Sequence, residues 1–231
     1  MKSKLRGIIF YTKKIKDHDL FIKILSSDDS LNSGLVYGGN STKKKLIYQN
    51  GYFVDYFITK KNQSSVPIIS GDICKPFLGD IINDKYKLNA LLSILSIINI
   101  SILEGQYIKG FYESVLKLIT KIINSKHWII DYCEWLFELL KIIGYQIDYN
   151  NNSNKNYFNI SIQEFSNNKD NNTIKFPHDL FSEKREISFA NIDLIFKIFE
   201  KIYTKNHLDN INYNMPINFL NFKKIILNNL K

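Results

Sequence analysis

The sequence predicts an α+β protein in which a closed β-barrel of five strands precedes an α-helical domain that carries a small β-hairpin insertion. Two observations support this prediction. The apolar residues of positions 1–80 form short runs separated by Gly, Asn, Asp and Ser, and further along they recur at intervals of three and four. A closed barrel suits the first pattern because closure leaves no unpaired strand edge. We therefore expect a barrel domain at 1–80 and a helical domain at 81–231.

Five apolar runs are the candidate strands. The clearest is Tyr52–Thr59, whose side chains alternate between Tyr52, Val54, Tyr56 and Ile58 on one face and the intervening residues on the other. The other runs are Gly7–Tyr11, Leu20–Leu25, Leu35–Tyr37 and Val66–Phe77. The pair Gly38-Gly39 ends the third run, and the freedom of glycine to adopt a positive φ predicts a sharp turn there. Three adjacent lysines, Lys43, Lys44 and Lys45, follow this turn.

Helical periodicity begins after the last run. Leu88–Leu103 is apolar almost all round, which predicts the central buried helix of a bundle. Stripes at 108–122 and 128–143 predict two more helices, the second ended by Gly144. A further helix is expected from Ser188 as N-cap, and a last one from Pro216 as its first residue. An Asn-rich insertion at about 149–180 interrupts the helices, and within it Tyr157–Phe165 alternates like one arm of a hairpin.

The charge balance indicates a polyanionic partner. The 231 residues include 31 basic and 22 acidic side chains, and the formal net charge is +9. Residues 1–80 hold 13 basic and 7 acidic side chains, a net of +6, and residues 81–231 hold 18 and 15, a net of +3. The excess favours nucleic acid or an anionic membrane as partner. However, only two basic residues are Arg, and AT-rich codons would also raise the Lys content.

Other classes of function have little support in the sequence. Cys74 and Cys133 are the only cysteines, which excludes a disulfide framework and leaves no zinc-type cysteine pair. The four histidines show no metal-ligand spacing, and Gly38-Gly39 lacks the Gly-Lys-Ser/Thr ending of a P-loop. The apolar runs are too short for a signal peptide and too polar to span a bilayer. We expect a cytoplasmic protein without membrane contact, cofactor, metal or enzymatic activity.

Four motifs follow one another in the N-terminal part: Gly7-Ile8-Ile9, Asp17-His18-Asp19-Leu20-Phe21-Ile22, Gly34-Leu35-Val36-Tyr37-Gly38-Gly39 and Gln49-Asn50-Gly51-Tyr52-Phe53-Val54. In this order and spacing they resemble the RecO family of bacterial DNA repair and recombination mediators. The segment from Tyr132 to Tyr145 and the opening Met215-Pro216 look like later helices of that family. The sequence departs from it at Asn40 and Thr42, where Arg would be usual, and at 149–173, where many members carry a four-cysteine zinc knuckle.

The resemblance implies that the barrel is an OB-fold, which binds single strands by a charged groove and aromatic rings. The DNA-binding residues it leads us to expect are Lys4, Arg6, Lys13, Lys14, Lys16, Tyr37, Lys43, Lys44, Lys45, Lys60 and Lys61. The tyrosines at 11, 37, 48 and 56 are candidate stacking platforms, although for each one taken singly a place in the barrel core is the better prediction.

The resemblance also implies a function and partners. The function is that of a recombination mediator that binds single- and double-stranded DNA, anneals complementary strands and helps to load RecA. The partners are RecR, the C-terminal tail of single-stranded-DNA-binding protein and, indirectly, RecA. The acidic tail needs an apolar pocket with a basic rim, for which Lys109, Lys117 and Lys121 are candidates on the outer side of one helix. The alternative is a protein-interaction module whose Lys content reflects genome composition, and an enzyme is a distant third.

Overall fold

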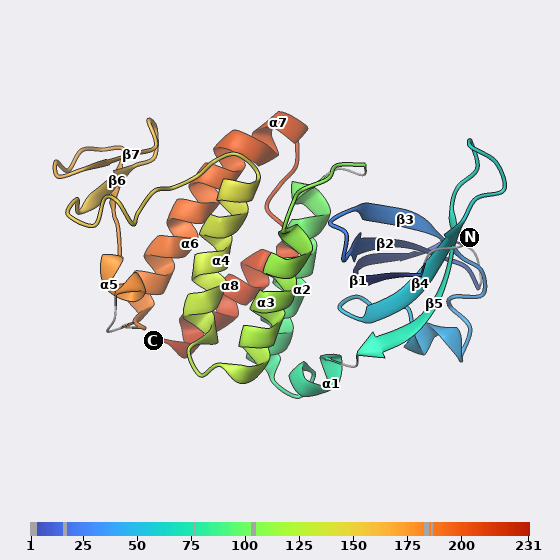
Figure 1. The fold of residues 1–231 in the computed structure, drawn as a ribbon. Helices are drawn as coiled ribbons and strands as arrows, with labels where there is room; N and C mark the ends of the chain where they lie inside the picture. Colours follow the sequence, from blue (N-terminus) through green and yellow to red (C-terminus); the bar gives the residue numbers. More distant parts are fainter. Residues whose placement is uncertain (1–3, 16–17, 76, 103–104, 183–184, 186) are drawn as a thin grey trace. The chain divides into compact units, whose positions relative to one another are not determined.

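The computed structural model describes the chain except for residues 1–3, 16–17, 76, 103–104, 183–184 and 186 (Figure 1). It contains two compact units, residues 1–119 and 120–231. The domain boundary at residue 80, where strands give way to helices, stays a prediction. Residues 81–119 group with the barrel in the first unit, in which α2 (Lys85–Ser101) packs against β1 (Leu5–Lys14).

Five strands close the barrel, as the sequence predicted. They are β1, β2 (Leu20–Ser26), β3 (Leu31–Val36), β4 (Phe53–Thr59) and β5 (Ile68–Lys75), in the order β1-β2-β3-β5-β4. Neighbouring strands are antiparallel except β3 and β5, which are parallel and pair at Leu35 and Ile68. The parallel pair closes the sheet, so that every strand has two partners.

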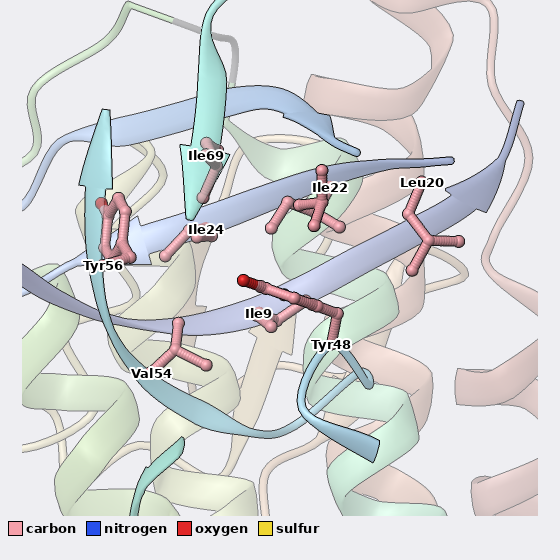
Figure 2. Close-up of a cluster of buried hydrophobic side chains, with 9 residues drawn as sticks. Ile9, Leu20, Ile22, Ile24, Tyr48, Val54, Tyr56 and Ile69 are labelled. Carbon is pink, nitrogen blue, oxygen red and sulfur yellow. The ribbon is translucent and has the colours of Figure 1, made fainter. Parts of the chain in front are cut away.

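The interior of the barrel is filled by aliphatic side chains and two tyrosines (Figure 2). Val54 and Tyr56 of β4 point into this core, as the alternation predicted. The Tyr56 hydroxyl hydrogen-bonds with that of Ser26 and accepts from Asn32 Nδ2 at 3.0 Å. The Tyr48 hydroxyl donates to the carbonyl of Gly71 at 2.9 Å. Tyr48 and Tyr56 are therefore core residues and not stacking platforms.

Two glycines have positions that other residues would disturb. A Cβ on Gly7 would lie 2.5 Å from Ile24 Cγ2 and from the carbonyl oxygen of Leu25, so β1 and β2 need glycine to approach closely. Gly38 has a φ of +63°, and its neighbour in the sequence pair, Gly39, is not among the residues with positive φ. The sharp turn predicted after β3 is thus confirmed, with one of the two glycines in the left-handed region.

Two helices beyond α1 (Leu78–Ile81) begin in the first unit. Helix α2 is capped by Asp84, whose carboxylate accepts from the amides of Tyr86 and Lys87. Its residues are buried along most of its length, as expected of a central helix, and it packs against the barrel strand β1. Helix α3 (Phe111–Asn124) begins where Asp29, in the turn between β2 and β3, accepts from the amides of Gly110 and Tyr112 at 2.6 and 2.8 Å.

The second unit is built on α6 (Phe189–Tyr203), which packs against both α4 (Trp128–Ile142) and α8 (Ile217–Asn229). The remaining helical segments are α5 (His178–Phe181), the π-helical turn η2 (Thr204–Leu208) and α7 (Asp209–Ile211). Ser188 caps α6 as predicted, since its hydroxyl accepts from the amide of Asn191. Gly144 ends α4 with a φ of +95°. Pro216 is the N-cap of α8 and not its first helical residue.

The insertion forms a three-stranded sheet of β6 (Tyr157–Asn159), β7 (Glu164–Ser166) and β8 (Thr173–Lys175), in the order β7-β6-β8. The segment 157–165 was expected to be a single arm. It turns instead, because Asn159 Oδ1 accepts from the amides of Ser161 and Ile162 and Gln163 has a φ of +58°. Within the described ranges of the whole chain, no helix has the length and apolar character needed to cross a bilayer.

Candidate nucleic-acid interface

Most of the predicted basic residues lie on segments that meet at one end of the barrel. Lys13 and Lys14 end β1, the lysine run lies between β3 and β4, and Lys60 and Lys61 begin the loop that projects between β4 and β5 (Figure 1). Three hydrogen bonds bring these segments together. The amide of Asn40 donates to the carbonyl of His18, the amide of Gly38 to the Asp19 carboxylate, and the amide of Leu35 to the carbonyl of Pro67, each at 2.8 Å.

The lysine run is held in a short 3₁₀ turn, η1 (Lys44–Leu46). Ser41 starts this turn, because its carbonyl accepts from the amide of Lys45 at 2.9 Å. All three ammonium groups are exposed, and none forms an ion pair in the described part of the chain. The run therefore presents three uncompensated positive charges within one turn of backbone, which suits contact with adjacent phosphates.

Tyr37 lies beside the run and is 51% exposed. The other exposed apolar side chains on the same segments are Ile15, Leu46 and Val66. By contrast, Tyr11 is half-buried, with the Lys23 ammonium 5.4 Å from its ring centroid. Of the four tyrosines considered as platforms, Tyr37 has the exposure that base stacking requires.

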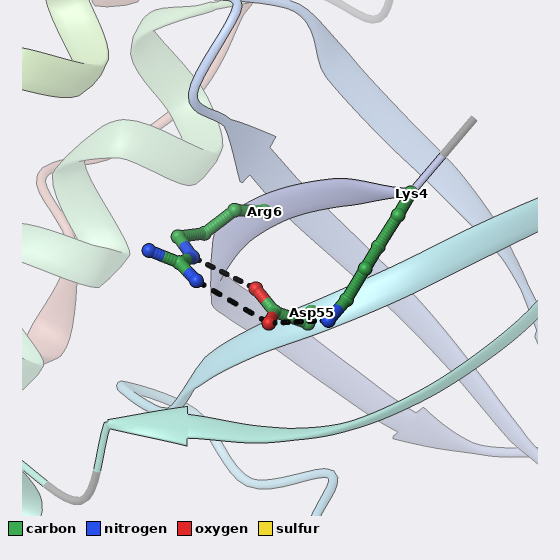
Figure 3. Close-up of polar contacts among 3 residues, drawn as sticks. All are labelled: Lys4, Arg6 and Asp55. Atoms are coloured by element: carbon green, nitrogen blue, oxygen red, sulfur yellow. Dashed lines mark hydrogen bonds and ion pairs between the residues drawn. The ribbon is translucent and has the colours of Figure 1, made fainter.

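Lys4 and Arg6 are held by a carboxylate that the sequence analysis did not single out (Figure 3). Arg6 Nε lies 2.7 Å from Asp55 Oδ1 and Arg6 Nη2 lies 3.3 Å from Oδ2, while Lys4 Nζ lies 2.9 Å from Oδ2. The hydrogen bonds from Arg6 and then Lys4 hold the pKa of Asp55 well below its usual range. The bond to Asp55 also raises the pKa of Arg6. The alternation of the sequence could have indicated this role, because it places Asp55 on the outer face of β4, the strand that pairs with β1.

The loop between β4 and β5 carries two more of the residues expected to bind DNA. Lys60 and Lys61 are exposed in a loop that Ser65 stabilises, since its hydroxyl accepts from the amides of Lys61 and Asn62. Lys16 lies outside the described residues. These basic residues therefore stay a predicted DNA-binding set, and among the described members Lys4 and Arg6 differ from the others by having an acidic partner.

The three lysines expected at a partner pocket have different surroundings. Lys109 precedes α3, which begins at Phe111, and does not lie on the helix as expected. Lys117 is exposed on α3. Lys121 Nζ donates to Asp131 Oδ1 at 2.5 Å, and the Asp131 side chain is only 3% exposed. Because Lys121 compensates a buried charge, its ammonium is not free to form a rim.

Groups capable of catalysis or metal binding are isolated. The described residues contain no cluster of three or more His, Cys, Asp or Glu side chains arranged to hold a metal ion. Cys133 is buried, and burial raises the pKa of its thiol, which disfavours the reactive thiolate. The second unit does contain a cleft of about 310 Å³ lined by Glu134, Glu138, Asp148 and Tyr149 among others. The spacing of four residues between Glu134 and Glu138, which places both on one face of a helix, was the feature of the sequence that could have indicated this cleft.

Comparison with known proteins gives several related sequences. The chain is 29% identical to the DNA repair protein RecO of Rickettsia canadensis over 148 residues, which are 64% of this chain and 61% of that protein. It is 30% identical to the DNA repair protein RecO of Rickettsia akari over 149 residues, and 27% identical to that of Rickettsia bellii over 150 residues. The matches thus span 61–62% of the length of these relatives. No protein-family model matches the chain.

Proposed function

We propose that the chain belongs to the RecO family, since it is 27–30% identical to RecO DNA repair proteins of Rickettsia over 64% of its length, and that it acts in DNA repair as a recombination mediator. The observation that carries this proposal is the uncompensated lysine run beside an exposed tyrosine at one end of the closed barrel. Phosphates would contact the ammonium groups of Lys43, Lys44 and Lys45, and a base would stack on Tyr37. Lys13, Lys14, Lys60 and Lys61 would extend the contact to neighbouring phosphates.

The mechanism we infer is electrostatic. Bringing two strands together is opposed by the repulsion of their phosphates, and a protein surface that neutralises both backbones reduces that repulsion. Each phosphate contact also releases condensed counterions, which makes binding strongly dependent on salt. Annealing of complementary strands follows from these two effects and needs no bond to be made or broken. For this reason we propose a non-enzymatic role.

The partners are part of the same proposal. A mediator would act on DNA coated with single-stranded-DNA-binding protein, contact the C-terminal tail of that protein, work together with RecR, and help RecA to load. Of the lysines expected at the tail site, Lys117 is the exposed helical residue whose ammonium forms no ion pair within the described residues. It is therefore our first candidate for contact with the acidic tail.

The test has two parts. Binding of a fluorescein-labelled oligothymidylate is measured over a range of salt concentrations, followed by annealing of two complementary oligonucleotides coated with single-stranded-DNA-binding protein. We expect affinity to fall steeply with salt and annealing to be faster with the protein than without it. Binding that is absent or insensitive to salt, or an annealing rate unchanged by the protein, would contradict the proposal.

A protein-interaction module is the second candidate. The exposed side chains of Ile15, Leu46 and Val66 favour it, because they lie on segments that meet at the same end of the barrel and exposed apolar groups often mark protein contacts. This function predicts that substitution of Ile15 and Leu46 by Ser leaves oligothymidylate binding unchanged while removing the contact with a protein partner. The DNA-binding function predicts instead that the lysines determine affinity for the oligonucleotide.

A further inference from the structure

Asp55 holds its two cationic neighbours in an arrangement that a phosphate could share. Both carboxylate oxygens are used: Oδ1 accepts from Arg6 Nε at 2.7 Å, and Oδ2 lies 3.3 Å from Arg6 Nη2 and 2.9 Å from Lys4 Nζ. A guanidinium donates to two oxygens of a phosphate with the same forked geometry. Lys4 and Arg6 are thus already positioned around one anion, the carboxylate of Asp55, which is part of the protein itself.

The cluster is accessible from solvent. The Lys4 and Arg6 side chains are 60% and 50% exposed, and the Asp55 side chain is 18% exposed. Ion pairs at such sites are weak, because water screens them and long side chains lose freedom on pairing. A phosphate that carries neighbouring phosphates with it can therefore compete with a single carboxylate for these cations.

The register of the sheet places a second acid beside the first. Arg6 of β1 pairs with Asp55 of β4, and Asp55 pairs with Asp72 of β5. Residues paired across strands have side chains on the same face, so one positive and two negative side chains follow one another across the outside of the barrel. Like charges on directly opposite residues destabilise a sheet. The cations held by Asp55 offset that repulsion.

We propose that Asp55 is an internal competitor of DNA phosphate for Lys4 and Arg6, and so limits the affinity of the barrel for nucleic acid. In the free protein the carboxylate occupies the position between the two cations. When DNA binds, a phosphate takes that position and Asp55 turns toward solvent. Leu5 pairs with Tyr56, so Lys4 lies near the end of β4 that leads to Lys60 and Lys61. A strand bound along this edge would meet both groups of lysines.

The inference rests on the proposed DNA binding, and the experiment separates the two. Asp55→Asn removes the negative charge and keeps the shape of the side chain, whereas Asp72→Asn makes the same change of charge on the paired residue without releasing Lys4 or Arg6. Binding of labelled oligothymidylate to the full chain is measured for the wild type and both variants over a range of salt. Thermal unfolding confirms that each variant is folded.

We expect Asp55→Asn to bind roughly fivefold more tightly at low salt, as the removal of one charge about 4 Å away predicts. Because a phosphate takes the position of Asp55 in both complexes, the slope of log affinity against log salt should change by less than about 0.7, the value of one phosphate contact on a single strand. Asp72→Asn should raise the affinity by less than half as much. Equal effects of the two variants, or weaker binding by Asp55→Asn, would overturn the inference.

A second variant keeps the inference testable if Asp55→Asn does not fold. Arg6→Gln in the wild type should weaken binding less than Lys44→Gln, because the charge of Arg6 is already compensated. Where Asp55→Asn does fold, adding Arg6→Gln to it should cancel the gain in affinity. A loss on Arg6→Gln in the wild type as large as that on Lys44→Gln would contradict competition by Asp55. If the wild type shows no salt-dependent binding, it is the proposed function that fails.

Discussion

The ammonium of Lys44 donates a hydrogen bond to the backbone carbonyl of Tyr37 at 2.9 Å. A carbonyl is a dipole and not an anion, so Lys44 keeps its full positive charge and two further N–H donors for a phosphate. The bond also ties the lysine run to the residue whose ring is exposed beside it. The structure thus brings together the two kinds of contact that single-strand binding requires, charge for the backbone and an aromatic face for a base.

Replacing Lys43, Lys44 and Lys45 together by Ala should weaken the binding of oligothymidylate and flatten its salt dependence. Three lost phosphate contacts correspond to a change of about 2 in the slope of log affinity against log salt. The matched control replaces Lys126, Lys201 and Lys224, exposed lysines of the second unit, by Ala. The control removes the same net charge from the chain. An equal effect of the two triple variants would show that total charge, and not this site, determines binding.

Tyr37→Ala should lower the affinity for oligothymidylate by roughly 1–3 kcal/mol if a base stacks on the ring. Tyr37→Phe keeps the aromatic face and should retain nearly all of the affinity. Because the ring is exposed, both variants should unfold at the temperature of the wild type. The measurement is a titration at fixed salt, and a loss of the same size in both variants would show that the hydroxyl group, and not the ring face, makes the contact.

Asp29→Ala should destabilise the first unit by about 1–2 kcal/mol. The carboxylate accepts from the amides of Gly110 and Tyr112 at the start of α3, where a negative charge and an acceptor are both favourable. Asp29→Asn should cost less, because Asn retains an acceptor oxygen and tolerates the φ of +64°. Unfolding in urea compares the two, and an Asn variant no more stable than the Ala variant would contradict the capping role.

Lys121→Met should lower the free energy of unfolding by about 2 kcal/mol or more, because it leaves the buried carboxylate of Asp131 without its cation. The loss should be smaller than the ~3–5 kcal/mol of a fully buried pair, since the Lys121 side chain is 38% exposed. Lys117→Met, one turn earlier on α3, should change stability by less than about 0.5 kcal/mol. Unfolding in denaturant would contradict this account if it showed equal effects at the two positions.

The stability that Asp55 contributes should depend on pH. Arg6 and Lys4 lower the pKa of Asp55 in the folded protein. The contribution is therefore fully present above the pKa of an unfolded Asp, about 4, and is lost as the pH falls toward the lower pKa of the folded state. The difference in unfolding free energy between the wild type and Asp55→Asn should stay constant between about pH 7 and 5 and shrink below about pH 4. A difference that grows as the pH falls would contradict the assignment.

The local elements were the most predictable part of the fold. Short apolar runs predicted all five barrel strands, because a strand needs only local alternation or a compact apolar segment. The ends were less certain: β1 continues to Lys14, well beyond the apolar run that ends at Tyr11. Pairing with β2 extends β1 to Lys14, and the residues at the end of β1 do not by themselves indicate this pairing.

Predictions that depended on packing partners were less accurate. The all-round apolar character of α2 indicated burial correctly but not what would bury it, and its partner is the barrel strand β1. Tyr48 and Tyr56 could have been platforms or core, and the closure of the barrel decided for the core. Among the candidate site residues, the sequence could not show that Lys121 serves Asp131, or that Arg6 and Lys4 serve Asp55.

The sequence by itself determined the order of strands and helices, the turn at Gly38 and the position of the lysine run, because these features depend on neighbouring residues and backbone freedom. Only the tertiary structure decided which charges remain uncompensated. Arg6 and Asp55 are 49 positions apart in the chain, and their meeting depends on how β1 and β4 pair in space. The sequence therefore shows where the lysines and arginines are, and the fold decides which of them can contact a phosphate.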